Sequence, residues 1–363
     1  MSTRQRAVVV LLLFAAALVV SACAGPDHLD IASDPAFDSD LPQNALDPAG
    51  PAAQSIDNLW WLVFWIATAV FVVVEAALLF AVFRYRRRKG VDRAVEQVHG
   101  NTRLEIMWTI IPVVLLAALA IPTIATLFEL RAEPEPEENA LQIEVTGHQW
   151  WWEFYYPEYG FSTANEMHIP AGRPVYLSMT SADVIHSFWV PQLNGKRDAV
   201  PGRITNLTLE ADEPGVFLGQ CTEFCGLAHA DMRHRVSAVS EAAFEAWATS
   251  QMQPAVVPTD GLAGAGWETF EILCASCHTV RGSSAAAELA PDLTHFASRE
   301  TFGGATIRYT EQHLREWLRD PNALKPMRPE LNDLSVGRVL GMPNLDLTEQ
   351  QIDELIAFLD TLE

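Results

Sequence analysis

The stretch Cys221-Thr-Glu-Phe-Cys225-Gly-Leu-Ala-His229-Ala-Asp-Met232 crowds two thiols, an imidazole and a thioether into one short loop. A further histidine, His186, lies upstream in Asp-Val-Ile-His-Ser-Phe. Thiolate and thioether are soft ligands that select copper, zinc or iron–sulfur clusters. A zinc site of two Cys and two His is the simplest alternative, but it has no use for Met232. The loop therefore predicts copper, and its second thiolate predicts two bridged copper ions.

The residues around this loop favour a β-sandwich. Short runs rich in β-branched and aromatic residues occur at Leu141–Thr146, Val175–Thr180 and Ile204–Leu209. Pro-Gly pairs at 201–202 and 214–215 mark turns between such runs. Several short strands at this spacing are typical of a sandwich or barrel. A loop of Cys and His in a strand-rich domain resembles the copper loop of a cupredoxin. We therefore expect a cupredoxin-like β-sandwich over residues 141–250.

A second motif, Cys274-Ala-Ser-Cys277-His278, lies beyond a Pro-containing linker at 251–262. Cys-x-x-Cys-His is the attachment signature of c-type haem, in which the thiols bind the vinyl groups and the His ligates the iron. A thioredoxin-like redox pair is the alternative, but the following His and the lack of a βαβ pattern argue against it. The flanking segments have helical patterns, so residues 263–363 resemble an all-α class I cytochrome c.

Two methionines compete for the sixth position of that iron. Met327 lies in Lys-Pro-Met-Arg-Pro and Met342 lies in Gly-Met-Pro-Asn. A methionine ligand raises the haem potential, as suits electron transfer. We favour Met342, because Thr348 follows it as a suitable N-cap and opens an amphipathic helix over 348–362. That order of ligand loop and capped helix resembles cytochrome c.

Two apolar runs, 59–83 and 106–128, are each long enough to cross a bilayer, which takes about 20 residues. The segment between them, 84–105, is strongly basic, and by the positive-inside rule it is cytoplasmic. We therefore expect a transmembrane hairpin within 56–130. The charged linker 131–140 then leads to domains outside the cytoplasm.

The N-terminus has the pattern of an exported lipoprotein. Residues 1–22 carry Arg4 and Arg6 before an apolar run that is too short to span a bilayer. Val-Ser-Ala then directly precedes Cys23, as in a bacterial lipoprotein cleavage box. We expect a lipoprotein-type signal peptide, a lipidated Cys23 and a flexible tether over 23–55. An ordinary export signal with a chance cysteine is the alternative.

The copper loop, His186 and the two apolar runs together resemble subunit II of cytochrome c oxidase, over about residues 55–245. The resemblance implies a dinuclear CuA centre with two bridging thiolates, two imidazoles, a thioether and a backbone carbonyl as ligands. These are Cys221, Cys225, His186, His229, Met232 and Glu223. It also implies that the Glu223 side chain reaches a magnesium ion shared with subunit I.

The same resemblance assigns roles to two further residues. Trp150, in Gly-His-Gln-Trp, matches the residue at which electrons enter subunit II, although the following residue, usually Tyr, is Trp151 here. Packing in a core or at the membrane interface is the alternative for Trp150. Glu105 matches a carboxylate at the mouth of a proton-uptake path into subunit I, and a solvated helix-end carboxylate is the alternative. Glu75, within the first apolar run, matches no known role, and we expect it to face another helix or subunit.

We interpret the chain as subunit II of a bacterial respiratory cytochrome c oxidase with a fused cytochrome c. It would pass electrons from an external donor through haem c and CuA to subunit I, which reduces oxygen to water with proton pumping. The expected partners are subunits I and III, a soluble or membrane-bound cytochrome c or other donor, and the lipid bilayer of the cell membrane. Neither apolar run contains a histidine to bind the haem or copper of an oxygen-reducing centre.

Composition and two alternatives bear on this interpretation. The formal net charge is −22, from 24 Lys and Arg against 46 Asp and Glu. Such a balance argues against nucleic acid as the main partner and favours basic protein partners.

Two alternative functions were weighed. A copper-binding assembly lipoprotein would explain the Cys and His but not a haem motif with two spanning helices. A nitrous-oxide-reductase-like CuA protein would need a large propeller, for which the chain has no room.

Overall fold

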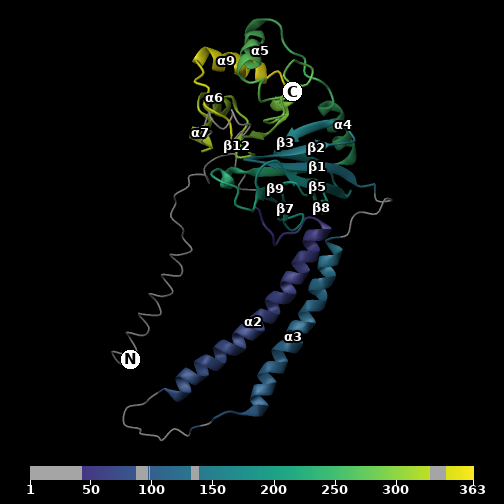
Figure 1. The fold of residues 1–363 in the computed structure, drawn as a ribbon. Coiled ribbons are helices and arrows are strands. Elements are labelled where there is room, and N and C mark those ends of the chain that lie inside the picture. The colour runs from purple at the N-terminus through teal and green to yellow at the C-terminus, as the bar shows by residue number, and fades with distance from the viewer. Residues whose placement is uncertain (1–42, 87–96, 98, 132–138, 328–340) are drawn as a thin grey trace. The chain divides into compact units, whose positions relative to one another are not determined.

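A computed structural model describes residues 43–86, 97, 99–131, 139–327 and 341–363, and Figure 1 shows the fold. The predicted signal peptide, Cys23 and half of the predicted cytoplasmic loop lie outside these residues. Helix α2 spans Pro51–Tyr85 and α3 spans Thr102–Glu129, so both extend beyond the apolar runs. Helix α2 starts early because Pro51 at its first position has a φ suited to a helix. Residues 51–55, which we expected in the tether, are therefore helical.

Both helices have the composition of membrane spans. Their most apolar windows have mean hydropathies of 2.6 and 2.5, and no residue in either window is buried. A helix that exposes apolar side chains all round is stable only in lipid or against another protein. Near their extracytoplasmic ends the helices are tied together, since the Ser55 hydroxyl donates to a Glu129 carboxylate oxygen at 2.7 Å. The predicted transmembrane hairpin is confirmed.

Two five-stranded sheets form the next domain (Figure 1). The first sheet has the order β3 (Phe161–Ala164), β2 (Trp151–Tyr156), β1 (Leu141–His148), β5 (Val175–Ser181) and β8 (Thr205–Leu209). The second has the order β4 (Glu166–Pro170), β10 (Arg233–Val239), β9 (Gly215–Cys221), β6 (His186–Trp189) and β7 (Arg197–Ala199). Burial alternates strictly along β5 and β10, as a sandwich requires. The β-sandwich prediction is confirmed.

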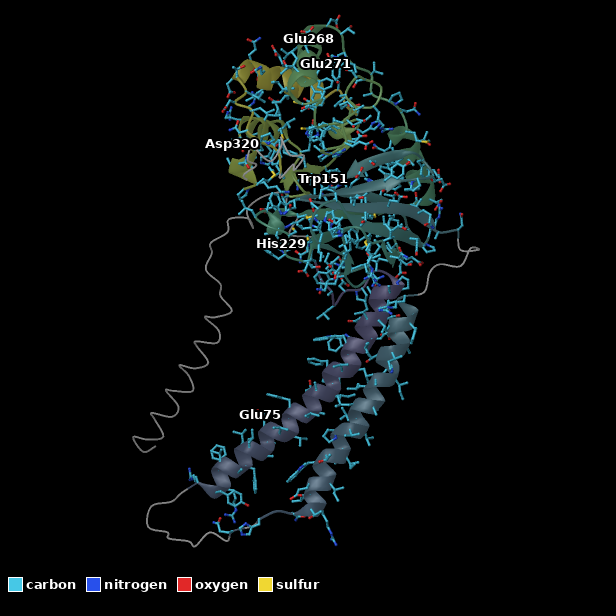
Figure 2. All side chains as sticks on the ribbon, in the orientation of Figure 1. Glu75, Trp151, His229, Glu268, Glu271 and Asp320 are labelled. Atoms are coloured by element: carbon cyan, nitrogen blue, oxygen red, sulfur yellow. The ribbon has the colours of Figure 1, made fainter. Side chains whose placement is uncertain are left out.

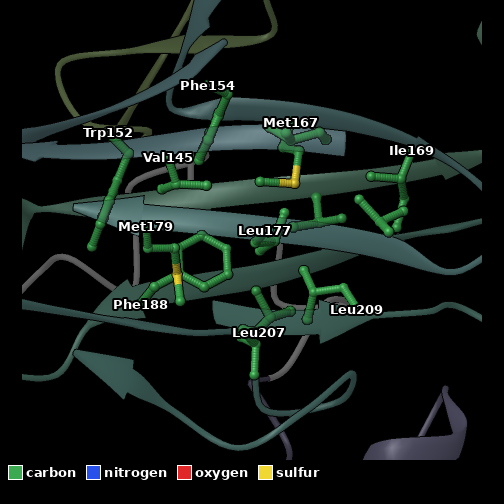
Figure 3. Packing of buried hydrophobic residues seen from close by; sticks show 14 of the residues in the cluster. Val145, Trp152, Phe154, Met167, Ile169, Leu177, Met179, Phe188, Leu207 and Leu209 are labelled. Carbon is green, nitrogen blue, oxygen red and sulfur yellow. The ribbon is translucent and has the colours of Figure 1, made fainter. Parts of the chain in front are cut away.

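The inner faces of the two sheets interdigitate in one apolar core (Figure 3). Trp152 and Phe154 from β2 reach Phe188 of β6, with ring centroids 5.5 and 6.3 Å from the Phe188 ring. All three are fully buried. Burial of each large apolar side chain contributes on the order of 1.5–3 kcal/mol. This core fixes β2 and β6, which carry the candidate site at their ends.

The C-terminal domain is mainly helical. Its helices are α5 (Gly261–Leu273), α6 (Glu311–Arg319), α7 (Pro321–Leu324) and α9 (Glu349–Leu359), and α4 (Glu241–Gln251) precedes it. Helices α5 and α9 pack against each other through Phe270 and Phe358, whose centroids lie 5.2 Å apart. The domain also contains a hairpin of β11 (Thr301–Phe302) and β12 (Ile307–Arg308), so it is not purely helical. The turn at Gly303-Gly304, with φ of 63° and 85°, allows this addition.

The predicted cap of the last helix is confirmed. The Thr348 hydroxyl accepts from the Gln351 amide at 3.3 Å, and the Gln351 side chain accepts from the Thr348 amide at 2.9 Å. This reciprocal capping box satisfies amides that the helix start leaves unpaired. The helix ends at Leu359, before the predicted residue 362.

We expect Gly266→Ala to destabilise the C-terminal domain by about 1–3 kcal/mol, because the helix crossing leaves no room for a methyl group. A Cβ at Gly266 would lie 2.0 Å from the Glu354 carbonyl oxygen and 2.7 Å from the Phe358 Cβ. Thermal unfolding of the purified chain measures the effect. Glu268→Ala, an exposed change on the same helix, is the control, and equal melting of the two variants would contradict this packing.

Candidate metal centre and haem cavity

The sandwich topology brings His186 to the Cys and His loop. Strand β9 ends at Cys221, and its neighbour β6 begins at His186, with Phe188 paired to Cys221. The loop, residues 221–232, leaves the sheet at Cys221 and returns at β10. It is closed by a hydrogen bond from the Cys221 amide to the Met232 carbonyl at 2.9 Å. The histidine and the loop are thus held by adjacent strands.

The sulfur and nitrogen atoms of the predicted ligands converge. The Cys221 and Cys225 Sγ atoms are 3.8 Å apart. The His186 Nδ1 lies 3.9 Å from Cys221 Sγ, and the His229 Nδ1 lies 3.5 Å from Cys225 Sγ. The Met232 Sδ lies 3.8 Å from Cys225 Sγ. A metal–thiolate bond measures about 2.3 Å, so sulfurs this close can share a metal ion.

Glu223 takes part through its backbone. Its carbonyl oxygen lies 3.2 Å from the Cys221 Sγ, whereas Met232 contacts the other sulfur, and the Glu223 side chain is exposed. The structure therefore brings together all six predicted donor groups. A single tetrahedral ion needs four ligands. Six convergent donors with paired thiols fit the predicted dinuclear centre.

Asp183 orients His186 and was not singled out from the sequence. Its carboxylate accepts from the His186 Nε2 at 2.7 Å, which leaves Nδ1 directed at the thiols. Burial alone would lower the pKa of His186, but the hydrogen bonds with Asp183 and Cys221 raise it above its usual value. Asp183 also accepts from the Gln149 amide at 2.6 Å. One sequence feature could have identified Asp183: it is an acid three residues before His186, at the junction between a loop and a strand.

The two thiols influence each other strongly. The hydrogen bond between the two thiols lowers the pKa of Cys221, with a further contribution from His186. The same hydrogen bond raises the pKa of Cys225. A bound cation would favour loss of the protons of both thiols.

The C-terminal domain contains an apolar cavity beside the haem motif. Its empty volume is about 1150 Å³, including space open to solvent, and Cys274, Cys277 and His278 line it. The His278 Nδ1 donates to the Pro291 carbonyl at 2.8 Å, which leaves Nε2 to bind a ligand. Burial lowers the pKa of His278, and the neutral imidazole is the form that binds a metal. These features fit haem c.

Both candidate methionines line this cavity. The Met342 Sδ accepts from the Trp317 indole nitrogen at 3.1 Å, and Asn322 donates to the Met342 carbonyl at 3.4 Å. Met327 is buried, and its side chain packs against the place where a Cβ of Gly341 would lie. A thioether has two lone pairs, so the contact with Trp317 leaves one available for iron.

Trp150 lies between the two sites. It lines the cavity, and its indole nitrogen donates to the Cys225 carbonyl at 3.1 Å. The Gln149 side chain donates to the same carbonyl at 2.5 Å. Trp151 also lines the cavity and stacks on His148, with centroids 4.2 Å apart. The contribution of Gln149 was not anticipated, although it precedes Trp150 in the quoted motif.

The intramembrane acids lie apart from these sites. Glu105 is exposed in the first turn of α3, where its carboxylate accepts from the Asn101 amide at 3.1 Å. This contact is typical of a helix start and is compatible with either role considered for Glu105. Glu75 is exposed partway along α2 (Figure 2).

Matches to protein-family models agree with this architecture. Residues 40–126 match the model of the cytochrome c oxidase subunit II transmembrane domain, 161–239 match that of its periplasmic domain, and 263–363 match cytochrome c. The periplasmic domain of subunit II of the Bradyrhizobium japonicum oxidase is 34% identical, with a TM-score of 0.30, over 31% of this chain and 92% of that one.

Full-length relatives give the same result. Cytochrome c oxidase subunit 2 of Alkalihalophilus pseudofirmus is 41% identical over 324 residues, which cover 88% of this chain and 90% of that protein. The protein of that name from Bacillus sp. strain PS3 is 36% identical over 296 residues, covering 77% and 80%. The chain therefore belongs to the cytochrome c oxidase subunit II family and carries a C-terminal cytochrome c domain.

Proposed function

We propose that this chain is the subunit through which electrons enter a bacterial respiratory oxidase, with haem c and a dinuclear CuA centre as its redox groups. Electrons would come from an external donor and leave to subunit I, which reduces oxygen to water with proton pumping. One observation carries the proposal: Trp150 lines the haem cavity and hydrogen bonds to the backbone of Cys225. One residue thus touches both candidate redox sites.

The loop residues would hold the copper pair. Cys221 and Cys225 would bridge the ions, with His186 and His229 on either side, while Met232 and the Glu223 carbonyl would complete the two ligand sets. Two bridged coppers and a haem each supply reversible uptake of one electron. The chain's own contribution is rigid placement, because β6 and β9 fix the ligands and Asp183 fixes the His186 ring.

Cys274, Cys277 and His278 would attach and ligate haem c, with Met342 as the sixth ligand. The cavity wall next to this site includes Trp150 and Trp151, so a bound haem would lie close to these aromatic residues. The hydrogen bond from Trp150 to the Cys225 carbonyl would link the cavity wall to the Cys and His loop. Protein-held proximity of this kind is what electron transfer requires.

The remaining assignments follow from family membership and the sequence. Glu105 would lie at a proton-uptake path into subunit I, and the exposed Glu223 carboxylate would reach a magnesium ion at the same partner. Subunit III and a cytochrome c or other donor complete the expected partners. Cys23 would carry lipid, with the copper and haem domains on the outer face of the cell membrane.

Cys225→Ser should abolish the dinuclear copper centre and oxidase turnover while leaving the haem c spectrum intact, because one bridging thiolate is lost. Metal analysis and visible spectra of the purified complex measure both. Two coppers bound per chain in the variant would show that Cys225 is not a bridging ligand. Retained copper with no oxidase activity in the unmodified complex would instead favour an assembly lipoprotein.

Met342→Ala should abolish the Met-to-iron charge-transfer absorption and lower the haem potential, because iron loses its thioether ligand. Met327→Ala is the matched control and should change neither quantity. The reverse outcome would identify Met327 as the ligand and would overturn the alignment of residues 327–342 with cytochrome c.

Trp150→Phe should slow electron transfer from haem c to copper by about tenfold or more, because it removes the hydrogen bond to Cys225 and disturbs a precisely held contact. Rapid reduction of haem c, followed optically at the haem and copper bands, measures this step. Trp247→Phe is the control, because Trp247 belongs to α4, packs on Tyr156 and Phe161 and does not line the haem cavity. Equal rates in the Trp150 variant and the wild type would contradict the proposed route.

A further inference from the structure

A buried lysine lies where the haem domain meets the sandwich. Lys325 follows α7, and only 2% of it is exposed. Its ammonium group donates to the carbonyl oxygens of Trp150 at 2.7 Å, Asp231 at 2.9 Å and Gly303 at 3.0 Å. A lysine ammonium has three N–H donors and no acceptor. Each donor therefore has one carbonyl partner.

The three carbonyls belong to three different segments. Trp150 belongs to the segment between β1 and β2, and Asp231 closes the short 3-10 helix η3 (His229–Asp231) of the Cys and His loop. Gly303 is at the turn of the hairpin in the haem domain. Carbonyls at the end of a helix carry partial negative charge and favour a cation. One side chain of the haem domain thus holds both sandwich segments that lead to the candidate copper centre.

A buried carboxylate makes the reciprocal contact. Glu166, in β4 of the sandwich, is 6% exposed. It accepts from the Thr301 amide at 2.7 Å, the Thr301 hydroxyl at 2.5 Å and the Glu300 amide at 3.2 Å. Both donor residues lie at the start of the hairpin in the haem domain. Each domain therefore places one buried ionisable side chain on polar groups of the other.

The hairpin turn fits tightly between these two contacts. The Arg233 amide donates to the Gly304 carbonyl at 3.0 Å, which joins the domains through their backbones. A Cβ at Gly304 would lie 2.4 Å from both the Asp231 oxygen and the Lys325 Nζ. A glycine is required here by space as well as by its φ of 85°.

These groups carry a strong constraint on geometry. A buried charge is tolerated only where it is fully hydrogen bonded, so loss of either partner opens the contact. The same interface has an ion pair at its edge, Arg235 with Glu300 at 3.0 Å, in which the Glu300 side chain is 70% exposed. An ion pair with one partner in solvent contributes little. The buried groups, and not the edge pair, should therefore decide how the two domains are held.

We propose that Lys325 and Glu166 are positioning residues that lock the haem domain and the sandwich into one fixed unit. Lys325 holds the Trp150 backbone and the end of the Cys and His loop at a constant distance from the haem cavity. The role of Lys325 and Glu166 in holding the two domains together does not depend on the proposed function. The consequence for electron transfer rests on the proposed function.

The test uses the full chain in its oxidase complex and compares Lys325→Met with wild type. Lys325→Met keeps the length of the side chain but removes its donors. We expect unchanged haem c and copper spectra and roughly tenfold slower transfer from haem c to copper, since loss of a buried charge contact opens the interface. Hydrogen exchange should also become faster in both residues 149–152 and residues 301–304. Glu300→Gln, which removes only the edge ion pair, is the matched control and should match wild type in both measurements.

Wild-type transfer rates and unchanged hydrogen exchange in Lys325→Met would overturn the proposal. If Lys325→Met loses the haem c or the copper spectrum, transfer rates and hydrogen exchange are measured in Glu166→Gln instead. That variant changes the opposite side of the interface and decides whether the proposal holds. Faster exchange without slower transfer would also overturn the positioning role. If wild type itself shows no transfer from haem c to copper, the proposed function fails, while hydrogen exchange still reports whether the domains are locked.

Discussion

The hydrogen bond from the Trp150 indole to the Cys225 carbonyl is the contact on which the arrangement of the two sites depends. It requires the segment after β1 to lie against the Cys and His loop, and Gly226 makes this approach possible. A Cβ at Gly226 would lie 3.0 Å from the Trp150 ring and 2.9 Å from the side-chain nitrogen of Gln149. The φ of Gly226 is 119°. A side chain at this position would push the ring away from the loop.

The sandwich supplies the rigidity that a metal site needs. The paired register of β6 and β9 sets His186 beside Cys221, and the aromatic core beneath them is fully buried. Ligands held by strands move less than ligands on a free loop, so the His186 imidazole can keep its place when the charge of the site changes. The loop contributes the remaining donors only because its two ends are joined at Cys221 and Met232.

Much of this organisation could be predicted from local patterns. The two membrane helices, the strand-rich domain and the capped last helix each have a strong periodic or compositional signal, and ligand spacing within residues 221–232 identifies the metal chemistry. Contacts between distant segments have no such signal. Nothing near Lys325 in the sequence indicates that its partners are Trp150 and Asp231, since those contacts exist only once the domains pack. Asp183 was missed for a related reason, because an acid near a histidine is common in loops.

Fusion of the haem domain to the sandwich removes the need for surface charge to bring these two domains together. A covalently attached partner is present at a high effective concentration, so the step between the two domains needs no long-range electrostatic attraction. The contacts found there are accordingly buried and short, with a lysine on carbonyls and a carboxylate on amides. The contacts between the two domains therefore do not rely on the formal net charge of −22, which can instead influence the binding of other proteins. Under the proposed function, an acidic chain would attract a basic donor protein from a distance, whereas the step between the two domains would depend on their fixed geometry.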